Sequence, residues 1–321
     1  DRRALAQEFR IVRDVEPLAG LAAGRAFERR DHLAPQLFDD VGPRLIGDLA
    51  VALIRDVEHD RRAVVFVAQD LEQGFLLLSD LGTTTYLQAL ADTPPDGLYQ
   101  QAFSALVAIQ KTSKPSVLPD YDRALLEREL RLFPDWYIAK HLNRSLSTTQ
   151  ANLLDKVFEQ ILANNLAQPR VYVHRDYHSR NLMVSEPNPG ILDFQDAVYG
   201  PITYDAVSLL KDAYVKWDEE RALDWLIRYW EGARSAGLPV PRDFAEFFRD
   251  YEWMGAQRHI KVLGIFARLY HRDGKDGYLK DMPLVMRYLR AACARYRELD
   301  PLYRLLDQLE PAGEQRAGYT F

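Results

Sequence analysis

Hydrophobic and polar residues follow two different periods along the chain. Two short apolar runs, at 63–67 and 74–79, are bounded by Asp and Gly residues, which is the pattern of strands in a small sheet. From about residue 98 onward, apolar residues instead recur every three or four positions, as they do on one face of a helix. This change of period predicts an α+β fold in which a small amino-terminal sheet precedes a larger, mostly helical part.

The helical part contains several long amphipathic stretches. One helix is predicted to end near Pro134, and longer helices are predicted over 223–230, 244–270 and 284–306. A further helix is predicted to begin after Thr203, with Thr203 as its N-cap. Asp205 would then lie in the first turn, where the helix dipole favours a carboxylate, so we expect Asp205 to be structural.

A β hairpin is predicted in the middle of the helical part. An apolar strand at 171–173 leads into a polar loop, and a second strand at 182–184 leaves the loop. The segment 186–190 is rich in Pro and Asn and would turn the chain, which returns through 191–194.

The expected pairing gathers polar side chains at one end of this hairpin. If the turn is centred near residues 187 and 188, residue 182 lies opposite residue 193, so Asn181 and Asp193 emerge together. Asp176 lies in the preceding loop at the same end. Carboxylate and carboxamide oxygens suit Mg²⁺ better than zinc, and Asp176 could accept a proton from an attacking hydroxyl. The residues therefore predict phosphoryl transfer.

Two other residue types in the loop allow more than one interpretation. His174 and His178 could be zinc ligands, but a strand precedes them and no third ligand is close in sequence, so we favour a structural role for His174. Arg175 could orient Asp176 or meet a phosphate, or it could simply be a charge partner for Asp176.

Composition narrows the class of substrate. The net charge is -6 and the sequence pI is near 5.7, which argues against a nucleic-acid partner because no positive face is available for the phosphate backbone. The apolar runs are much shorter than a membrane span, and Cys293 is the one cysteine, in an alanine-rich segment typical of a core. We expect a cytoplasmic protein with a small-molecule substrate and no obligate protein partner.

The loop carries a recognisable motif. His174-Arg175-Asp176, with Asn181 five residues after the aspartate and Asp193-Phe194 further on, resembles the catalytic loop and metal aspartate of kinases. His178 and the run Leu192-Asp193-Phe194-Gln195-Asp196 make the chain resemble the aminoglycoside-phosphotransferase family of small-molecule kinases. Within that family, 173–183 and 193–201 are similar to bacterial anomeric sugar kinases, which phosphorylate N-acetylmuramate and N-acetylglucosamine at C1 during cell-wall recycling.

This resemblance implies a role for each matching residue. Asp176 would be the catalytic base, and Asn181 and Asp193 would be the Mg²⁺ ligands. Asp80 and Leu81, with the following glycine, would form the hinge against which the adenine of ATP lies. The resemblance also implies a two-lobed, protein-kinase-like fold, with a small lobe over 1–80 and a catalytic lobe over 81–321.

Three further residues are candidates for substrate contact. His178 belongs to the motif that carries the resemblance, and Asp196, three residues past Asp193 in a loop, could hold a sugar hydroxyl or simply form a turn. Arg258, or Lys261 one helical turn away, could meet an anionic group of the sugar such as a lactyl carboxylate, although a solvated helix face is the usual explanation of such residues.

The amino-terminal segment departs from the family pattern. The first lysine is Lys111 and no glycine-rich phosphate loop is readable, so Arg55, Arg61 or Arg62 would have to bind the ATP phosphates. The segment up to about residue 67 is either a divergent lobe or in part an out-of-frame reading of the gene.

Two alternatives to an amino-sugar kinase follow. One is a phosphotransferase for another hydroxyl compound, such as an aminoglycoside or choline. The other is a nucleotide-binding protein without transfer activity, which the missing lysine and phosphate loop would suggest.

Overall fold

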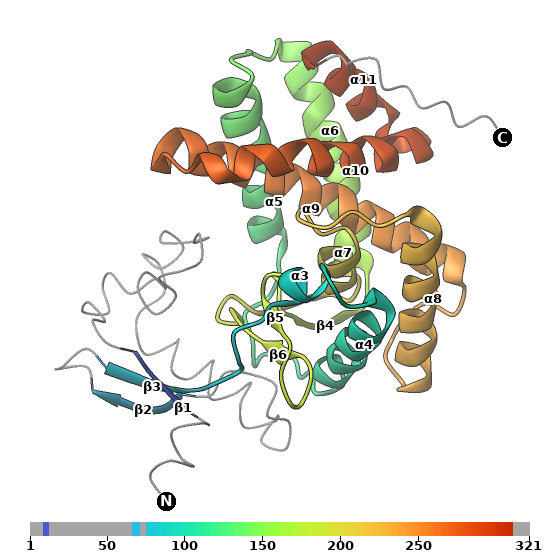
Figure 1. The fold of residues 1–321 in the computed structure, drawn as a ribbon. Helices are drawn as coiled ribbons and strands as arrows, with labels where there is room; N and C mark the ends of the chain where they lie inside the picture. Colours follow the sequence, from blue (N-terminus) through green and yellow to red (C-terminus); the bar gives the residue numbers. More distant parts are fainter. Residues whose placement is uncertain (1–8, 13–65, 71–74, 311–321) are drawn as a thin grey trace, which may run out of the picture.

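A three-stranded antiparallel sheet lies apart from the helical body (Figure 1). The computed structural model describes residues 9–12, 66–70 and 75–310. The central strand of the sheet, β3 (Phe75–Ser79), pairs with β1 (Phe9–Val12) on one side and with β2 (Phe66–Asp70) on the other. The predicted strand at 74–79 is confirmed, whereas the run at 63–67 overlaps β2 only at its last two residues, and 63–65 lies outside the described residues.

Helices make up most of the remaining chain. The first group is α3 (Tyr86–Ala89), α4 (Pro95–Lys111), α5 (Arg123–Leu132), the π-helix η2 (Phe133–His141) and α6 (Thr148–Ala167). The second group is α7 (Tyr204–Leu210), α8 (Glu219–Ser235), α9 (Phe244–Asp273), the 3₁₀ helix η3 (Asp276–Asp281), α10 (Met282–Arg295), the 3₁₀ helix η4 (Arg297–Leu299) and α11 (Asp300–Leu309).

Two short antiparallel pairs of strands separate these groups. β4 (Arg170–Val173) pairs with β7 (Val198–Pro201), and β5 (Leu182–Met183) pairs with β6 (Gly190–Ile191). Leu182 lies opposite Ile191 and not opposite residue 193 as predicted. The turn is therefore centred one residue earlier in the sequence than expected, which moves the partner of Leu182 by two residues. A shift of two residues keeps each side chain on its face of the ribbon, so the predicted meeting of polar residues survives the error.

Two predicted helices differ in detail from the structure. The stretch 284–306 is two helices, because Tyr296 adopts an extended conformation between α10 and the short η4 turn. Thr203 precedes α7 as predicted, but its hydroxyl donates to Gln168 (2.7 Å) and does not cap the helix.

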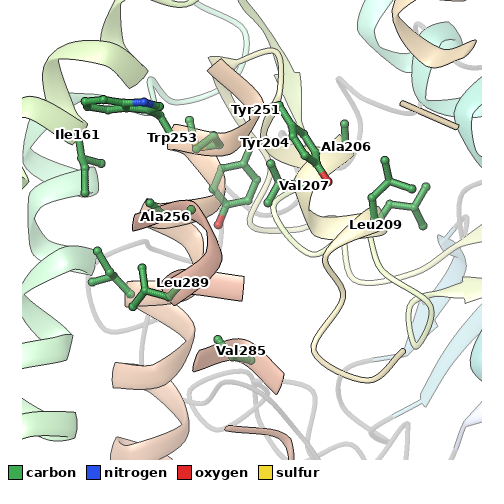
Figure 2. Close-up of a cluster of buried hydrophobic side chains, with 14 of the residues drawn as sticks. Ile161, Tyr204, Ala206, Val207, Leu209, Tyr251, Trp253, Ala256, Val285 and Leu289 are labelled. Atoms are coloured by element: carbon green, nitrogen blue, oxygen red, sulfur yellow. The ribbon is translucent and has the colours of Figure 1, made fainter. Parts of the chain in front are cut away.

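Helix α9 organises the core. It is 30 residues long, and α5, η2, α7 and α10 pack around it, so even polar residues of its middle turns are buried. Figure 2 shows how aromatic and aliphatic side chains from α6, α7, α9 and α10 converge, among them Tyr204, Trp253, Ala256 and Leu289. Cys293 of α10 is fully buried, which confirms its predicted place in the core. Across the described ranges, no helix is long and apolar enough to cross a membrane.

The crossing of α9 with the end of α5 leaves no room for a side chain at Gly264. A Cβ there would lie 2.5 Å from the carbonyl carbon and 2.7 Å from the carbonyl oxygen of Leu132. We expect Gly264→Ala to lower the free energy of unfolding in urea by about 1–3 kcal/mol through overpacking.

Gly232 of α8 is the matched control, because a Cβ there meets no atom within 4 Å. Gly232→Ala should raise stability by about 0.5–1 kcal/mol through helix propensity. A Gly264→Ala protein as stable as the parent would contradict the close packing of α9 against α5.

Candidate active site

The polar loop 174–181 connects β4 to β5 and is anchored by a buried carboxylate. The backbone N–H groups of His174 and Arg175 donate to the two oxygens of Asp205 in α7, at 2.7 and 3.0 Å. Burial raises the pKa of Asp205 to about 7, although these two hydrogen bonds and Arg258 favour its charged form. The predicted structural role of Asp205 is confirmed, and the structure shows its function, which is to hold the start of the loop.

Asp176 follows directly and faces two cations of α9. Its side chain is 35% exposed, and Arg258 Nη1 lies 3.9 Å from its Oδ1 atom. Partial burial opposes ionisation, but the positive charges of Lys261 and Arg258 outweigh it and lower the pKa of Asp176 to about 2. Asp176 is therefore a carboxylate at neutral pH, and part of it can be reached by a ligand.

Asn181 and Asp193 meet at the end of the β5–β6 ribbon. The backbone N–H of Leu192 donates to the carbonyl of Asn181 (2.9 Å), and the Asn181 amide donates to the carbonyl of Asp176 (3.1 Å) and lies close enough to Asp193 to favour the charged form of its carboxylate. Asp193 has a positive φ of 67°, which turns its side chain out of the strand direction. Asp176, Asn181 and Asp193 therefore lie close together, as predicted, and their roles stay a prediction.

The electrostatics of this group suit a divalent cation. Burial raises the pKa of Asp193 to about 6, the charges of Asp176 and Asp196 add to the effect, and the Gln195 amide (2.6 Å from Oδ1) opposes it. Clustered carboxylates and an amide oxygen are the ligands that Mg²⁺ prefers, and a cation would offset their mutual repulsion. In the described part of the chain, no three His, Cys, Asp or Glu residues are grouped to hold a metal, so a zinc site on His174 and His178 has no support there.

The predicted hinge packs against the same ribbon. Asp80 Oδ1 accepts from the N–H of Gly82 (2.9 Å), and Leu81 forms a small buried cluster with Met183 of β5 and Leu192. The N–H of Val184 donates to the carbonyl of Thr84 (2.8 Å), so the segment after the hinge runs alongside β5. The predicted hinge thus lies next to the metal-binding candidates.

The candidate substrate residues lie at different depths. His178 is buried against Tyr214, and its Nδ1 atom has no hydrogen-bond partner within the described ranges. Burial raises the pKa of Asp196, whose backbone carbonyl accepts from Arg175 Nη1 at 3.3 Å. Arg258 is only 5% exposed and donates to the carbonyl of Arg175 (3.0 Å) and to the Tyr204 hydroxyl (3.3 Å). Their contact with a substrate stays a prediction.

His174 has the structural role that we favoured from the sequence. Its Nδ1 atom accepts from the N–H of Asp176 (3.3 Å), and burial lowers its pKa to about 4, so the ring is neutral. The loop also binds a residue that was not predicted from the sequence. Asp212, just after α7, accepts from the N–H (3.0 Å) and the hydroxyl of Ser179.

Glu129 of α5 is the second residue that the sequence reading missed. Its buried carboxylate forms ion pairs with both Arg175 and Lys261 on the inner side of the loop. A signal for it was present, because Glu129 occupies the same helix face as the buried Leu126 and Leu130. The phosphate-binding candidates Arg55, Arg61 and Arg62 lie outside the described residues.

Comparison with known proteins identifies the family of the chain. The sequence model of the phosphotransferase enzyme family (APH) matches residues 5–245. The chain belongs to this family of phosphotransferases. The phosphotransferase is 53% identical over 256 residues to a Neisseria meningitidis protein named N-acetylmuramate/N-acetylglucosamine kinase, covering 78% of this chain and 77% of the relative. A Pseudomonas aeruginosa protein of the same name is 53% identical over 248 residues, covering 77% of this chain and 73% of the relative.

Solved structures support the fold of this phosphotransferase. A choline kinase from Streptococcus pneumoniae has a TM-score of 0.55 at 14% identity, over 82% of this chain and 85% of the other. A choline/ethanolamine kinase family protein from Mesorhizobium loti has the same score and identity, over 81% and 83%. The two-lobed, protein-kinase-like fold is confirmed, and the lobe boundary near residue 80 stays a prediction.

The anchor at Asp205 can be tested by removing its carboxylate. Asp205→Ala leaves two buried N–H groups of the loop without acceptors, so we expect the free energy of unfolding to fall by about 3 kcal/mol and turnover to fall with it. Urea denaturation and a coupled assay of ADP release measure the two effects.

Asp243 offers a matched control, because its exposed carboxylate also accepts a backbone N–H, that of Ala245 (2.9 Å), at the start of α9. Asp243→Ala should lose about 1 kcal/mol of stability and no turnover. Equal effects of the two substitutions would show that Asp205 has no special relation to the loop.

Proposed function

We propose that this phosphotransferase uses ATP and Mg²⁺ to phosphorylate the anomeric hydroxyl of N-acetylmuramate, N-acetylglucosamine or both, as in the recycling of peptidoglycan. The observation that carries the proposal is the 53% identity with two proteins named for these substrates, over more than three quarters of the chain. The grouping of Asp176, Asn181 and Asp193 at one ribbon end supports the same reaction class.

The reaction assigns one role to each polar group. The oxygen of the sugar hydroxyl forms a bond to the γ-phosphorus of ATP. The bond between that phosphorus and the β–γ bridging oxygen breaks, and ADP leaves with its electron pair. The hydroxyl proton passes to Asp176. A carboxylate with a pKa of about 2 is a weak base, but the transition state of phosphoryl transfer is loose and needs little proton abstraction before the bond to ADP breaks. Asn181 and Asp193 would hold Mg²⁺, which offsets the negative charge of the phosphates.

Nucleotide and sugar would approach this group from different sides. Adenine binding at the hinge is supported by the packing of Leu81 on Met183 and Leu192, which sets the hinge beside the ribbon that ends at Asn181 and Asp193. His178 supports sugar binding, because its buried Nδ1 atom needs a polar partner and it lies in the same loop as Asp176.

The two alternative functions have weaker support. The choline kinase matches at 14% identity, which concerns the fold alone, so choline as acceptor has no support beyond the fold. A protein that binds nucleotide without transfer would have no need of an exposed carboxylate beside two metal-binding candidates.

Asp176 can be tested directly. Asp176→Asn keeps the shape of the side chain but removes the proton acceptor, so we expect kcat to fall by about 10²- to 10⁴-fold with little change in KM for ATP. Asp224→Asn, at an exposed position of α8 paired with Arg228, is the control and should retain parent kinetics. Near-normal turnover by Asp176→Asn would refute the base assignment.

The acceptor can be identified by a panel assay. ATP turnover with Mg²⁺ should be seen with N-acetylmuramate or N-acetylglucosamine and be absent with choline and kanamycin. Phosphorus NMR of the product should show a phosphate on the anomeric oxygen. A phosphate on any other hydroxyl, or transfer to choline or kanamycin in preference to the sugars, would overturn the proposal.

A further inference from the structure

Arg175 holds an unusual backbone conformation immediately before Asp176. Its φ of 75° lies in the left-handed region, which residues other than Gly, Asn and Asp rarely adopt. Such a conformation persists only where surrounding contacts impose it. Because Asp176 is the next residue, the backbone angles of Arg175 set the direction of the Asp176 carboxylate.

Contacts to the backbone of Arg175 come from two helices. Its N–H donates to Asp205 of α7 (3.0 Å), and its carbonyl accepts from Arg258 of α9 (3.0 Å). These bonds hold the peptide groups on either side of the residue.

The side chain of Arg175 provides a third attachment, which runs inward and away from solvent. One terminal nitrogen, Nη2, binds Glu129, and the other, Nη1, donates to the carbonyl of Asp196 (3.3 Å). The guanidinium carbon lies 5.6 Å from the centroid of the Tyr121 ring. With its side chain 7% exposed, Arg175 is directed away from any phosphate in the cleft, which favours the orienting role over a phosphate contact.

Glu129 is the centre of this attachment. Besides Arg175 it accepts hydrogen bonds from the Tyr121 hydroxyl and from Gln257 Nε2 (3.0 Å), and Lys261 Nζ lies 2.9 Å away. Burial opposes its ionisation, but Lys261 and Arg175 together lower the pKa of Glu129 to about 2. Glu129 is therefore a buried anion whose four partners come from α9, from the segment before α5 and from the catalytic loop.

We propose that Glu129 is a positioning residue for phosphoryl transfer, which holds Arg175 and through it the backbone that directs Asp176. Glu129 acts through another residue and touches no substrate. The inference depends on the proposed function for its kinetic test, but its structural consequence, an ordered loop, can be measured without any acceptor.

The chain contains a matched control for this proposal. Glu252 of α9 is also buried and also binds two cations, Lys211 and Arg295 (2.8 Å to the latter). Neither cation belongs to the catalytic loop. Removing the charge of Glu252 should therefore disturb packing to a similar degree without acting on Arg175.

The experiment compares Glu129→Gln with Glu252→Gln. We expect both to lower Tm, but only Glu129→Gln to lower kcat, by about 10²-fold, as expected for a displaced catalytic group, with KM for ATP changed less than about twofold. Hydrogen–deuterium exchange of the peptide spanning 173–177 should become faster in Glu129→Gln alone. Equal losses of kcat in both variants, or a kcat of Glu129→Gln within about threefold of the parent, would overturn the proposal.

A double-mutant cycle tests whether Glu129 acts through Arg175. The Arg175→Gln and Glu129→Gln substitutions together should lower kcat no further than Arg175→Gln alone, since both break the same attachment. Fully additive losses would contradict this route.

A variant that does not fold, or a failure of the proposed function, can be told apart from a failure of this inference. If Glu129→Gln does not fold, Glu129→Asp replaces it, because it keeps the buried charge but withdraws the carboxylate from Arg175, and the same results are expected. If the parent phosphorylates no amino sugar, the proposed function fails while loop exchange still decides this inference. Faster exchange in the Glu129 variant alone supports it, and unchanged exchange refutes it.

Discussion

The catalytic loop depends on buried carboxylates that bind it from beneath. Asp205 accepts hydrogen bonds from the N–H groups at its start, Asp212 accepts from the N–H and the hydroxyl of Ser179, and Glu129 binds the side chain of Arg175. A carboxylate in the interior needs close charged or N–H partners. Each of these carboxylates therefore fixes a particular arrangement of the loop, and the partly exposed Asp176 is held in place by buried groups.

The fold could be predicted to the level of its elements but not of their pairing. The change from a two-residue to a 3.6-residue period separates the sheet from the helices, and the long stretch 244–270 corresponds to α9. The register of β5 and β6 could not be predicted, because the turn in the Pro-rich segment 186–190 can be centred at several positions. The observed partner of Leu182 differs from the predicted one by two residues. The division of 284–306 was missed because both α10 and α11 present apolar faces and only the extended Tyr296 and the short η4 lie between them.

The site could be predicted where its residues are close in sequence. Asp176, Asn181 and Asp193 all lie in the short stretch 176–193, and local spacing was enough to bring them together. Glu129 in α5 and Asp212 after α7 are far from the loop in sequence, and the periodicity of a sequence does not show which loop a buried carboxylate will face. Arg258 illustrates the same limit, since its position on α9 indicated a cation near the site but not that it would lie beneath the loop backbone.

A crystal structure with a non-hydrolysable ATP analogue, Mg²⁺ and N-acetylmuramate would test the central claim most directly. The account predicts the metal on Asn181 and Asp193, adenine against Leu81, and the C1 hydroxyl of the sugar within hydrogen-bond distance of Asp176. A metal bound elsewhere, or a sugar that presents another hydroxyl to Asp176, would contradict it.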